Sequence, residues 1–99
     1  MATIFTKIIQ GEIPGHIIWQ NEDAVAFMDK GPVNPGHVLL VPRKEVDYIF
    51  DLDDVLYGKL WEIAKKLAPA IQKASNCKRV GIAVEGFAVP HAHIHLVPV

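Results

Sequence analysis

The stretch HAHIHLVP, residues 91–98, alternates histidine with apolar residues and ends in an apolar run. Successive side chains of a β-strand point to opposite faces of the sheet, so this period of two predicts a strand. The histidines of such a strand share one face, and the apolar side chains between them enter the other layer. The histidines of this face are His91, His93 and His95.

Four further apolar segments predict the rest of a small sheet. Residues 16–20 (HIIWQ) and 24–28 (AVAFM) flank the turn-forming residues 21–23, which indicates a hairpin. Residues 37–41 (HVLLV) form an unbroken apolar run, which is typical of a central strand covered on both faces. Residues 79–85 (RVGIAVE) predict the last strand, beside the histidine strand.

Two helices are expected beside these strands. Residues 53–74 begin with acids suited to a helix N-terminus and continue with apolar residues three or four apart. Residues 4–10 (IFTKIIQ) have near-helical apolar spacing that closes at Gly11 and Pro14. The predicted fold class is α+β, with a mostly antiparallel sheet of about five strands, one long helix and a short N-terminal helix. We expect residues 1–99 to form a single domain that ends just after the histidine strand.

Length and charge limit the classes of function. Acids and bases are interspersed and the net charge is -1, so the chain offers no basic face for a nucleic acid and no polybasic run for a membrane. We therefore expect a small-molecule partner. The sequence has neither an apolar run long enough to span a membrane nor a secretory signal pattern, so we expect a cytoplasmic protein.

Core size and cysteine content narrow the expectation further. A chain of 99 residues buries only a thin core, and its strands leave unpaired edges, so pairing with a second copy would bury more surface. We expect a homodimer. Because Cys77 is the only cysteine, an internal disulfide and a cysteine-rich zinc site are excluded.

The histidine cluster has three interpretations. It could be the solvated face of a strand, although three of the five histidines at strict alternation make that a poor explanation. It could bind a metal, but the outer pair is roughly 13 Å apart along a strand, too far for three ligands to share one ion. The favoured interpretation is phosphate chemistry near neutral pH, in which one neutral imidazole is a nucleophile and its neighbours donate hydrogen bonds. The middle histidine, His93, is the natural nucleophile.

The chain resembles the histidine triad (HIT) family, whose signature is three histidines alternating with apolar residues, here HAHIHLV. The resemblance extends to IFTKIIQGEIP at residues 4–14, AFMDKGPVNPGHVLLVPRK at residues 26–44, and DL at residues 51–52. It implies a homodimer of α+β subunits that bind a purine nucleotide and attack its α-phosphorus. It also implies a covalent nucleotidyl intermediate on the middle histidine, which water hydrolyses.

The resemblance assigns roles to single residues. His93 matches the nucleophile, His95 the histidine that hydrogen-bonds the phosphate, His91 the one that orients the site, and His37 a histidine packed behind the triad. Asp29 matches the residue that holds the ribose hydroxyls, with capping of its own loop as the alternative. The residues that match the apolar lining of the base pocket, with plain core packing as the alternative, are Ile4, Phe5, Ile8, Ile13, Phe27 and Leu39.

The sequence also departs from the family pattern. Many relatives bind a structural zinc where this chain has Thr3, Thr6 and Glu45, so we predict no metal and no cofactor. The loop before the triad, residues 86–90 (GFAVP), lacks the polar side chain that many relatives use there, so phosphate contacts must come from backbone N–H groups or be fewer. Relatives usually continue beyond the position of Val99.

Hydrolysis of a purine nucleoside phosphoramidate or adenylate is the expected activity, because the GEIP and PGHVLLVP surroundings resemble the housekeeping branch of the family. The alternatives are hydrolysis of dinucleoside polyphosphates by the same His93 mechanism and a nucleotide-binding scaffold dimer with little turnover. A metal-dependent enzyme is the least favoured.

Overall fold

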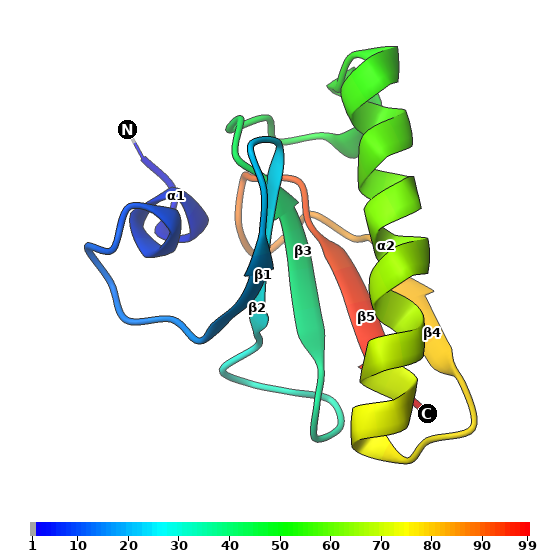
Figure 1. The fold of residues 1–99 in the computed structure, drawn as a ribbon. Coiled ribbons are helices and arrows are strands. Elements are labelled where there is room, and N and C mark those ends of the chain that lie inside the picture. Colours follow the sequence, from blue (N-terminus) through cyan, green and yellow to red (C-terminus); the bar gives the residue numbers. More distant parts are fainter. Residues whose placement is uncertain (1) are drawn as a thin grey trace.

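A computed structural model describes residues 2–99 of the chain and confirms the predicted fold class. Two helices lie on opposite faces of one five-stranded sheet (Figure 1). No helix of the described residues is both long and apolar enough to cross a membrane. In chain order the elements are α1 (Ile4–Ile9), β1 (Ile17–Gln20), β2 (Ala24–Met28), β3 (Val38–Pro42), the 3-10 turn η1 (Ile49–Asp51), α2 (Asp54–Ser75), β4 (Val80–Ala83) and β5 (Ile94–Pro98).

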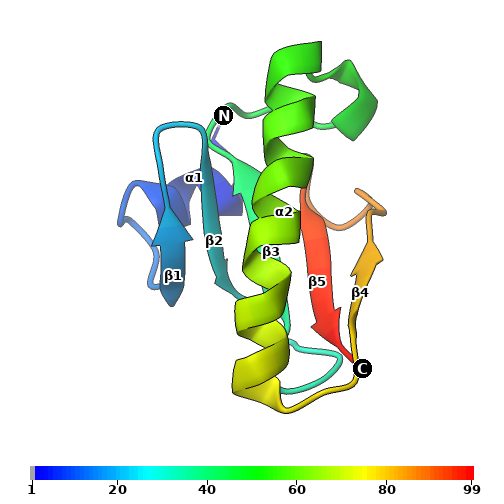
Figure 2. The ribbon, with the colours of Figure 1, turned by 45° about the vertical axis from the view of Figure 1, so that its right-hand side comes forward.

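The sheet has the strand order β1-β2-β3-β5-β4, and every neighbouring pair is antiparallel (Figure 2). β3 is the middle strand, as its unbroken apolar sequence predicts, and all five of its residues are buried. Its register sets Leu39 opposite Phe27 on one side and opposite His95 on the other. The histidine strand therefore lies next to the centre of the sheet.

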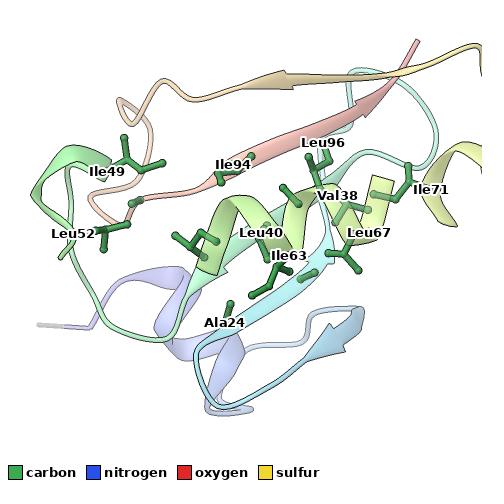
Figure 3. Packing of buried hydrophobic residues seen from close by; sticks show 14 residues of the cluster. Ala24, Val38, Leu40, Ile49, Leu52, Ile63, Leu67, Ile71, Ile94 and Leu96 are labelled. Atoms are coloured by element: carbon green, nitrogen blue, oxygen red, sulfur yellow. The ribbon is translucent and has the colours of Figure 1, made fainter. Parts of the chain in front are cut away.

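One face of the sheet packs against α2 and forms the main core (Figure 3). The helix begins after Asp53, whose side chain accepts a hydrogen bond from the backbone N–H of Leu56 at 2.9 Å. It ends at Asn76, which adopts the left-handed conformation at φ 53°. Between these ends an apolar stripe of α2 meets the sheet residues that face it. These sheet residues are Ala24, Ala26, Val38, Leu40, Ile94 and Leu96.

The other face carries a smaller core under α1. Phe5 and Ile8 of this helix pack against the alternate side chains of β2 and β3, which are Val25, Phe27, Leu39 and Val41. Thr3 begins the helix, and its side chain accepts a hydrogen bond from the backbone N–H of Thr6 at 3.2 Å. This face is where the histidine side chains emerge.

The histidine strand is shorter than predicted, because β5 begins at Ile94 and leaves His91 and His93 in the segment before it. The reason is that the backbone there bonds to loops: His91 N–H donates to Val89 O at 2.8 Å and Ala92 N–H to Val46 O at 2.7 Å. β4 is also shorter than the predicted strand at 79–85.

Leu40 is 0% exposed in the core under α2, so Leu40→Ala should lower the free energy of unfolding by about 2–5 kcal/mol. Urea denaturation measures this loss. Val55, which is 67% exposed on α2, gives the matched control: Val55→Ala should stay within about 0.5 kcal/mol of the parent. Equal denaturation midpoints for the two variants would contradict the described core.

Candidate active site

The alternation at residues 91–96 separates histidines from core residues even though only part of it is strand. Ala92, Ile94 and Leu96 belong to the core under α2. On the opposite face the ring of Phe5 meets the rings of His91 and His93, with centroids 5.7 Å and 5.0 Å apart. The His93 and His95 rings are adjacent at 4.8 Å. The three histidines of the sequence pattern therefore lie together beneath α1.

His93 is held in one tautomer by the backbone. Its Nδ1 lies 2.8 Å from the carbonyl oxygen of His91, which can only accept, so Nδ1 carries the proton and donates it. Nε2 then carries the lone pair, and no residue among 2–99 hydrogen-bonds it. His93 is 4% exposed and is one of the residues that line a cavity. When the ring carries a single proton, this arrangement leaves a lone pair of fixed direction on Nε2, which an imidazole can use as a nucleophile.

His95 is held in the opposite tautomer through His37. The chain enters β3 through Gly36, at φ 91°, and His37 directly follows it. The backbone N–H of Val33 donates to His37 Nδ1 at 3.1 Å, so the His37 proton is on Nε2, which lies 2.9 Å from His95 Nδ1. His95 Nδ1 therefore accepts, and its Nε2–H remains available as a donor. Burial, followed by the neighbouring His93 and His37, lowers the pKa of His95.

His91 is 0% exposed and lies behind the other two. Its Nε2–H donates to the carbonyl oxygen of Pro42 at 2.7 Å, and its Nδ1 lies 2.8 Å from Thr3 Oγ1. Burial is the main cause that lowers the pKa of His91, and the bond to Pro42 opposes it. This histidine is shielded from solvent, and its carbonyl oxygen is the group that accepts from His93 Nδ1.

A cavity of about 360 Å³ opens between α1 and the sheet, and His93 and His95 line it. Most residues that the sequence assigns to a base pocket are there, whereas Ile13 is not: it packs at the edge of the smaller core. His37 and His91 also lie outside the cavity wall, behind the residues that form it. The predicted residues in the wall are Ile4, Phe5, Ile8, Phe27, Asp29 and Leu39.

Asp29 has two environments, one for each carboxylate oxygen. Oδ1 accepts a hydrogen bond from the backbone N–H of Gly31 at 3.0 Å, which is the loop-capping alternative. Oδ2 lies 3.5 Å from His37 Nδ1, and the side chain lines the cavity. Capping the loop therefore orients the carboxylate toward the cavity.

Most of the wall residues that escaped the sequence analysis belong to connections without a periodic pattern, whereas Met28 is the last residue of β2. Lys30 could have been predicted as a wall residue, because it is a cation that directly follows Asp29 in the sequence. The others come mainly from the segment before β1 and the loop before the triad. The added wall residues are Gly15, His16, Met28, Lys30, Ala88 and Val89.

A second hollow, of about 470 Å³, reaches His93 from another direction. Aromatic side chains from η1, α2 and the loop after β4 line it: Tyr48, Phe50, Trp61 and Phe87. His93 therefore adjoins two spaces, one under α1 and one beside η1.

Two groups of residues are candidates for binding a metal ion. Thr3, Thr6 and Glu45 lie together, and Thr3 contacts His91. Threonine hydroxyls are not usual zinc ligands, and here they are engaged in hydrogen bonds, so this set does not fit zinc. Asp29, His37 and His95 each offer one ligand atom within 4.8 Å of the others. Both His37 nitrogens already have polar partners, which favours a hydrogen-bonded relay there.

Comparison with known proteins agrees with this geometry. A family model described as the HIT domain matches residues 10–99. The chain is similar to an uncharacterised HIT-like protein of Saccharolobus solfataricus, at 33% identity over 100 residues that cover 96% of this chain and 72% of that protein.

Solved structures are similar over nearly the whole chain. One is a hypothetical histidine triad nucleotide-binding protein from Sulfolobus tokodaii, with TM-score 0.87 and 27% identity over 95% of this chain and 66% of that one. Another is a HIT family hydrolase from Legionella pneumophila, with TM-score 0.82 and 31% identity over 97% of this chain and 91% of that one. Together with the family model across residues 10–99, these matches show that the chain belongs to the HIT domain family.

Proposed function

We propose that the protein hydrolyses a purine nucleoside monophosphate linked to an amine or a similar leaving group, through a covalent intermediate on His93. The observation that carries this proposal is the pair of opposite tautomers on adjacent rings. His93 presents a lone pair on Nε2, and His95 presents a proton on Nε2. A nucleophile and a hydrogen-bond donor side by side are what displacement at phosphorus requires.

The reaction then takes two displacements. The lone pair of His93 Nε2 attacks the α-phosphorus, and the bond from phosphorus to the leaving nitrogen breaks as that nitrogen takes a proton from water, while His95 Nε2–H donates a hydrogen bond to a phosphoryl oxygen. Water next attacks the phosphorus and returns a proton to the solvent, and the bond to His93 Nε2 breaks with its electron pair returning to the ring. The products are the nucleoside monophosphate and the amine. His93 Nδ1 keeps its bond to the His91 carbonyl throughout.

The cavity under α1 suits a purine nucleoside. Apolar side chains form much of its wall, and Asp29 and Lys30 stand among them as polar groups. In the proposal the base lies against the apolar wall, Asp29 accepts hydrogen bonds from the ribose hydroxyls, and the phosphate reaches His93 and His95. The second hollow beside His93 leaves space for the departing group. The similarity to the Legionella HIT family hydrolase and to the Sulfolobus histidine triad nucleotide-binding protein supports hydrolysis and nucleotide binding.

One assay separates this proposal from its rivals. AMP release is measured from an adenosine phosphoramidate and from a dinucleoside polyphosphate, each with and without a chelator. Faster release from the phosphoramidate, unchanged by the chelator, supports the proposal. Preference for the dinucleoside polyphosphate favours that activity instead, tight AMP binding without turnover favours a scaffold, and loss with chelator favours a metal-dependent enzyme.

His93→Ala should abolish turnover and leave AMP affinity within about threefold, because it removes the nucleophile and so the whole two-step path. Mass spectrometry of the intact protein after rapid quenching without acid should show one nucleotidyl group on the parent and none on this variant. His95→Ala is the contrast: it loses a hydrogen-bond donor to the phosphoryl group, so it should still form the adduct, but more slowly. An adduct on His93→Ala would refute the mechanism.

Asp29→Ala should weaken AMP binding about tenfold or more, because charge-assisted hydrogen bonds contribute about 1.5–3 kcal/mol. Calorimetry with AMP and with 2′,3′-dideoxy-AMP isolates the ribose contact. The parent should prefer AMP, and Asp29→Ala should bind both ligands equally. Asp29→Asn keeps an oxygen for the Gly31 N–H and controls for a disturbed loop. A preserved preference for AMP in Asp29→Ala would remove the ribose role from this residue.

We also propose that the protein forms a homodimer through the β4 edge. β4 is a terminal strand of the sheet, and large apolar side chains are exposed on it and beside it. Exposed apolar groups next to an unpaired strand edge favour association with a second copy. The exposed apolar residues of this region are Tyr48, Phe50, Ile82, Val84 and Phe87.

Light scattering at micromolar concentration should then report about twice the 11.0 kDa chain mass. Ile82→Lys should give the single-chain mass, because Ile82 is 53% exposed in the isolated chain and a buried lysine at the interface would lose its hydration. Ile18→Lys, on β1 at the opposite edge of the sheet, should leave the dimer intact. If the parent itself is a monomer, or if only Ile18→Lys dissociates, the β4 interface is wrong.

A further inference from the structure

Three segments distant in sequence meet at the buried side of His91. They are residues 3–6, the turn after β3 and the segment before β5. Glu45 Oε1 accepts hydrogen bonds from the backbone N–H of Thr3 at 2.6 Å and from the hydroxyl of Thr6 at 2.8 Å. One carboxylate oxygen therefore fixes the start of α1 to the turn after β3.

Thr3 makes a second connection through its side chain. Its hydroxyl oxygen accepts from the Thr6 backbone N–H and lies 2.8 Å from Nδ1 of His91. Because His91 Nε2 donates to the carbonyl of Pro42, Nδ1 is the acceptor in the neutral ring. The Thr3 hydroxyl therefore donates to Nδ1 of His91, a residue 88 positions later in the sequence.

These bonds hold His91 at both ring nitrogens, and the carbonyl of the same residue holds His93. That carbonyl accepts from His93 Nδ1–H, and this bond leaves the lone pair on Nε2. A change in the side chain or backbone of His91 would therefore alter the direction, and the proton position, of His93. Phe5, two residues beyond Thr3, contacts both rings and transmits a shift of α1 to the same place.

The charge states agree with this role. The backbone hydrogen bond from Thr3, followed by the Thr6 hydroxyl, lowers the pKa of Glu45, so the carboxylate is ionised at neutral pH. Burial lowers the pKa of His91, so that ring is neutral. The acceptor and donor roles described here are those that such charge states require.

Building on the proposed function, we propose that Thr3 and Glu45 are positioning residues for the nucleophile: they fix the orientation of His91, whose carbonyl in turn orients His93. We call the hydrogen bonds among Thr3, Thr6, Glu45 and His91 the N-terminal clamp. The clamp touches neither substrate nor phosphorus. It acts on the rate of adduct formation and not on nucleotide affinity.

Thr3→Val tests the clamp directly, since valine keeps the shape of threonine but has no hydroxyl. We expect the single-turnover rate of nucleotidyl adduct formation to fall about 10- to 100-fold, because a small displacement of a reacting group has that effect. AMP affinity should change less than about threefold. Thr3→Ser restores a hydroxyl that both accepts and donates, so it should recover most of the parent rate.

Ring ¹⁵N NMR reports which ring nitrogen carries the proton, and a loss of stability alone would not change that position. The parent should show His91 with its proton on Nε2 and His93 with its proton on Nδ1. Thr3→Val should keep the His91 proton on Nε2, which still faces the Pro42 carbonyl, but should shift the His91 Nδ1 resonance because that nitrogen loses the hydrogen bond it accepts. It should also give mixed tautomers at His93 with a weakened Nδ1–H signal, and Thr3→Ser should match the parent. A lower melting temperature with unchanged tautomers and an unchanged adduct rate would show that Thr3 only stabilises the helix, and would overturn the proposal.

Glu45→Ala is the second test, chosen because Glu45 is exposed and its replacement should leave the core intact. It should lower the adduct rate in the same direction as Thr3→Val, while Glu45→Gln, which keeps an acceptor oxygen, should lower it less. Glu62→Ala, an exposed glutamate on α2, should equal the parent. Parent-like rate and tautomers in Glu45→Ala would remove Glu45 from the clamp. If the parent forms no adduct, the proposed function fails, and the tautomers of the Thr3 and Glu45 variants still decide the clamp.

Discussion

Apolar side chains at every second position from residue 92 to residue 96 are buried against α2, and this burial determines where the histidines lie. With those side chains in the core, the pleat of the chain directs the intervening histidines to the opposite face. There the rings of His91 and His93 meet Phe5 of α1. The hydrophobic core on one face thus fixes the chemical groups on the other, and the period holds even at His91 and His93, where the ladder of β5 has not yet begun.

Neighbouring imidazoles end up with opposite roles because each is held by a backbone group of fixed character. A carbonyl can only accept, so the His91 carbonyl forces the proton of His93 onto Nδ1. A backbone N–H can only donate, so Val33 forces the proton of His37 onto Nε2, and His37 then sets His95. No charged residue is needed to tell the two rings apart. Fixed backbone polarity therefore supplies a lone pair and a proton within one pair of contacting rings.

The periodic parts of this molecule could be predicted from sequence, and the parts without a period could not. The fold class, the middle position of β3 and the extent of α2 follow from hydrophobic periods of 2 and 3.6 residues. The start of β5 could not be predicted in this way, because it depends on hydrogen bonds that His91 and Ala92 donate to the carbonyls of Val89 and Val46. Ile13 is apolar and close in sequence to true wall residues, yet the turn after α1 directs it to the edge of the smaller core. Lys30 lies in a loop whose course no pattern encodes.

The contacts that stabilise the N-terminal helix also hold the histidines of the site. A helix of six residues is too short to persist alone in water, so α1 exists only through tertiary contacts. Those contacts are the burial of Phe5 and Ile8 and the hydrogen bonds from Thr3 and Thr6 to Glu45. The same Phe5 meets His93, and the same Thr3 meets His91. Any event that loosens α1 must therefore release the histidines as well, and the cavity wall that α1 provides is lost with them.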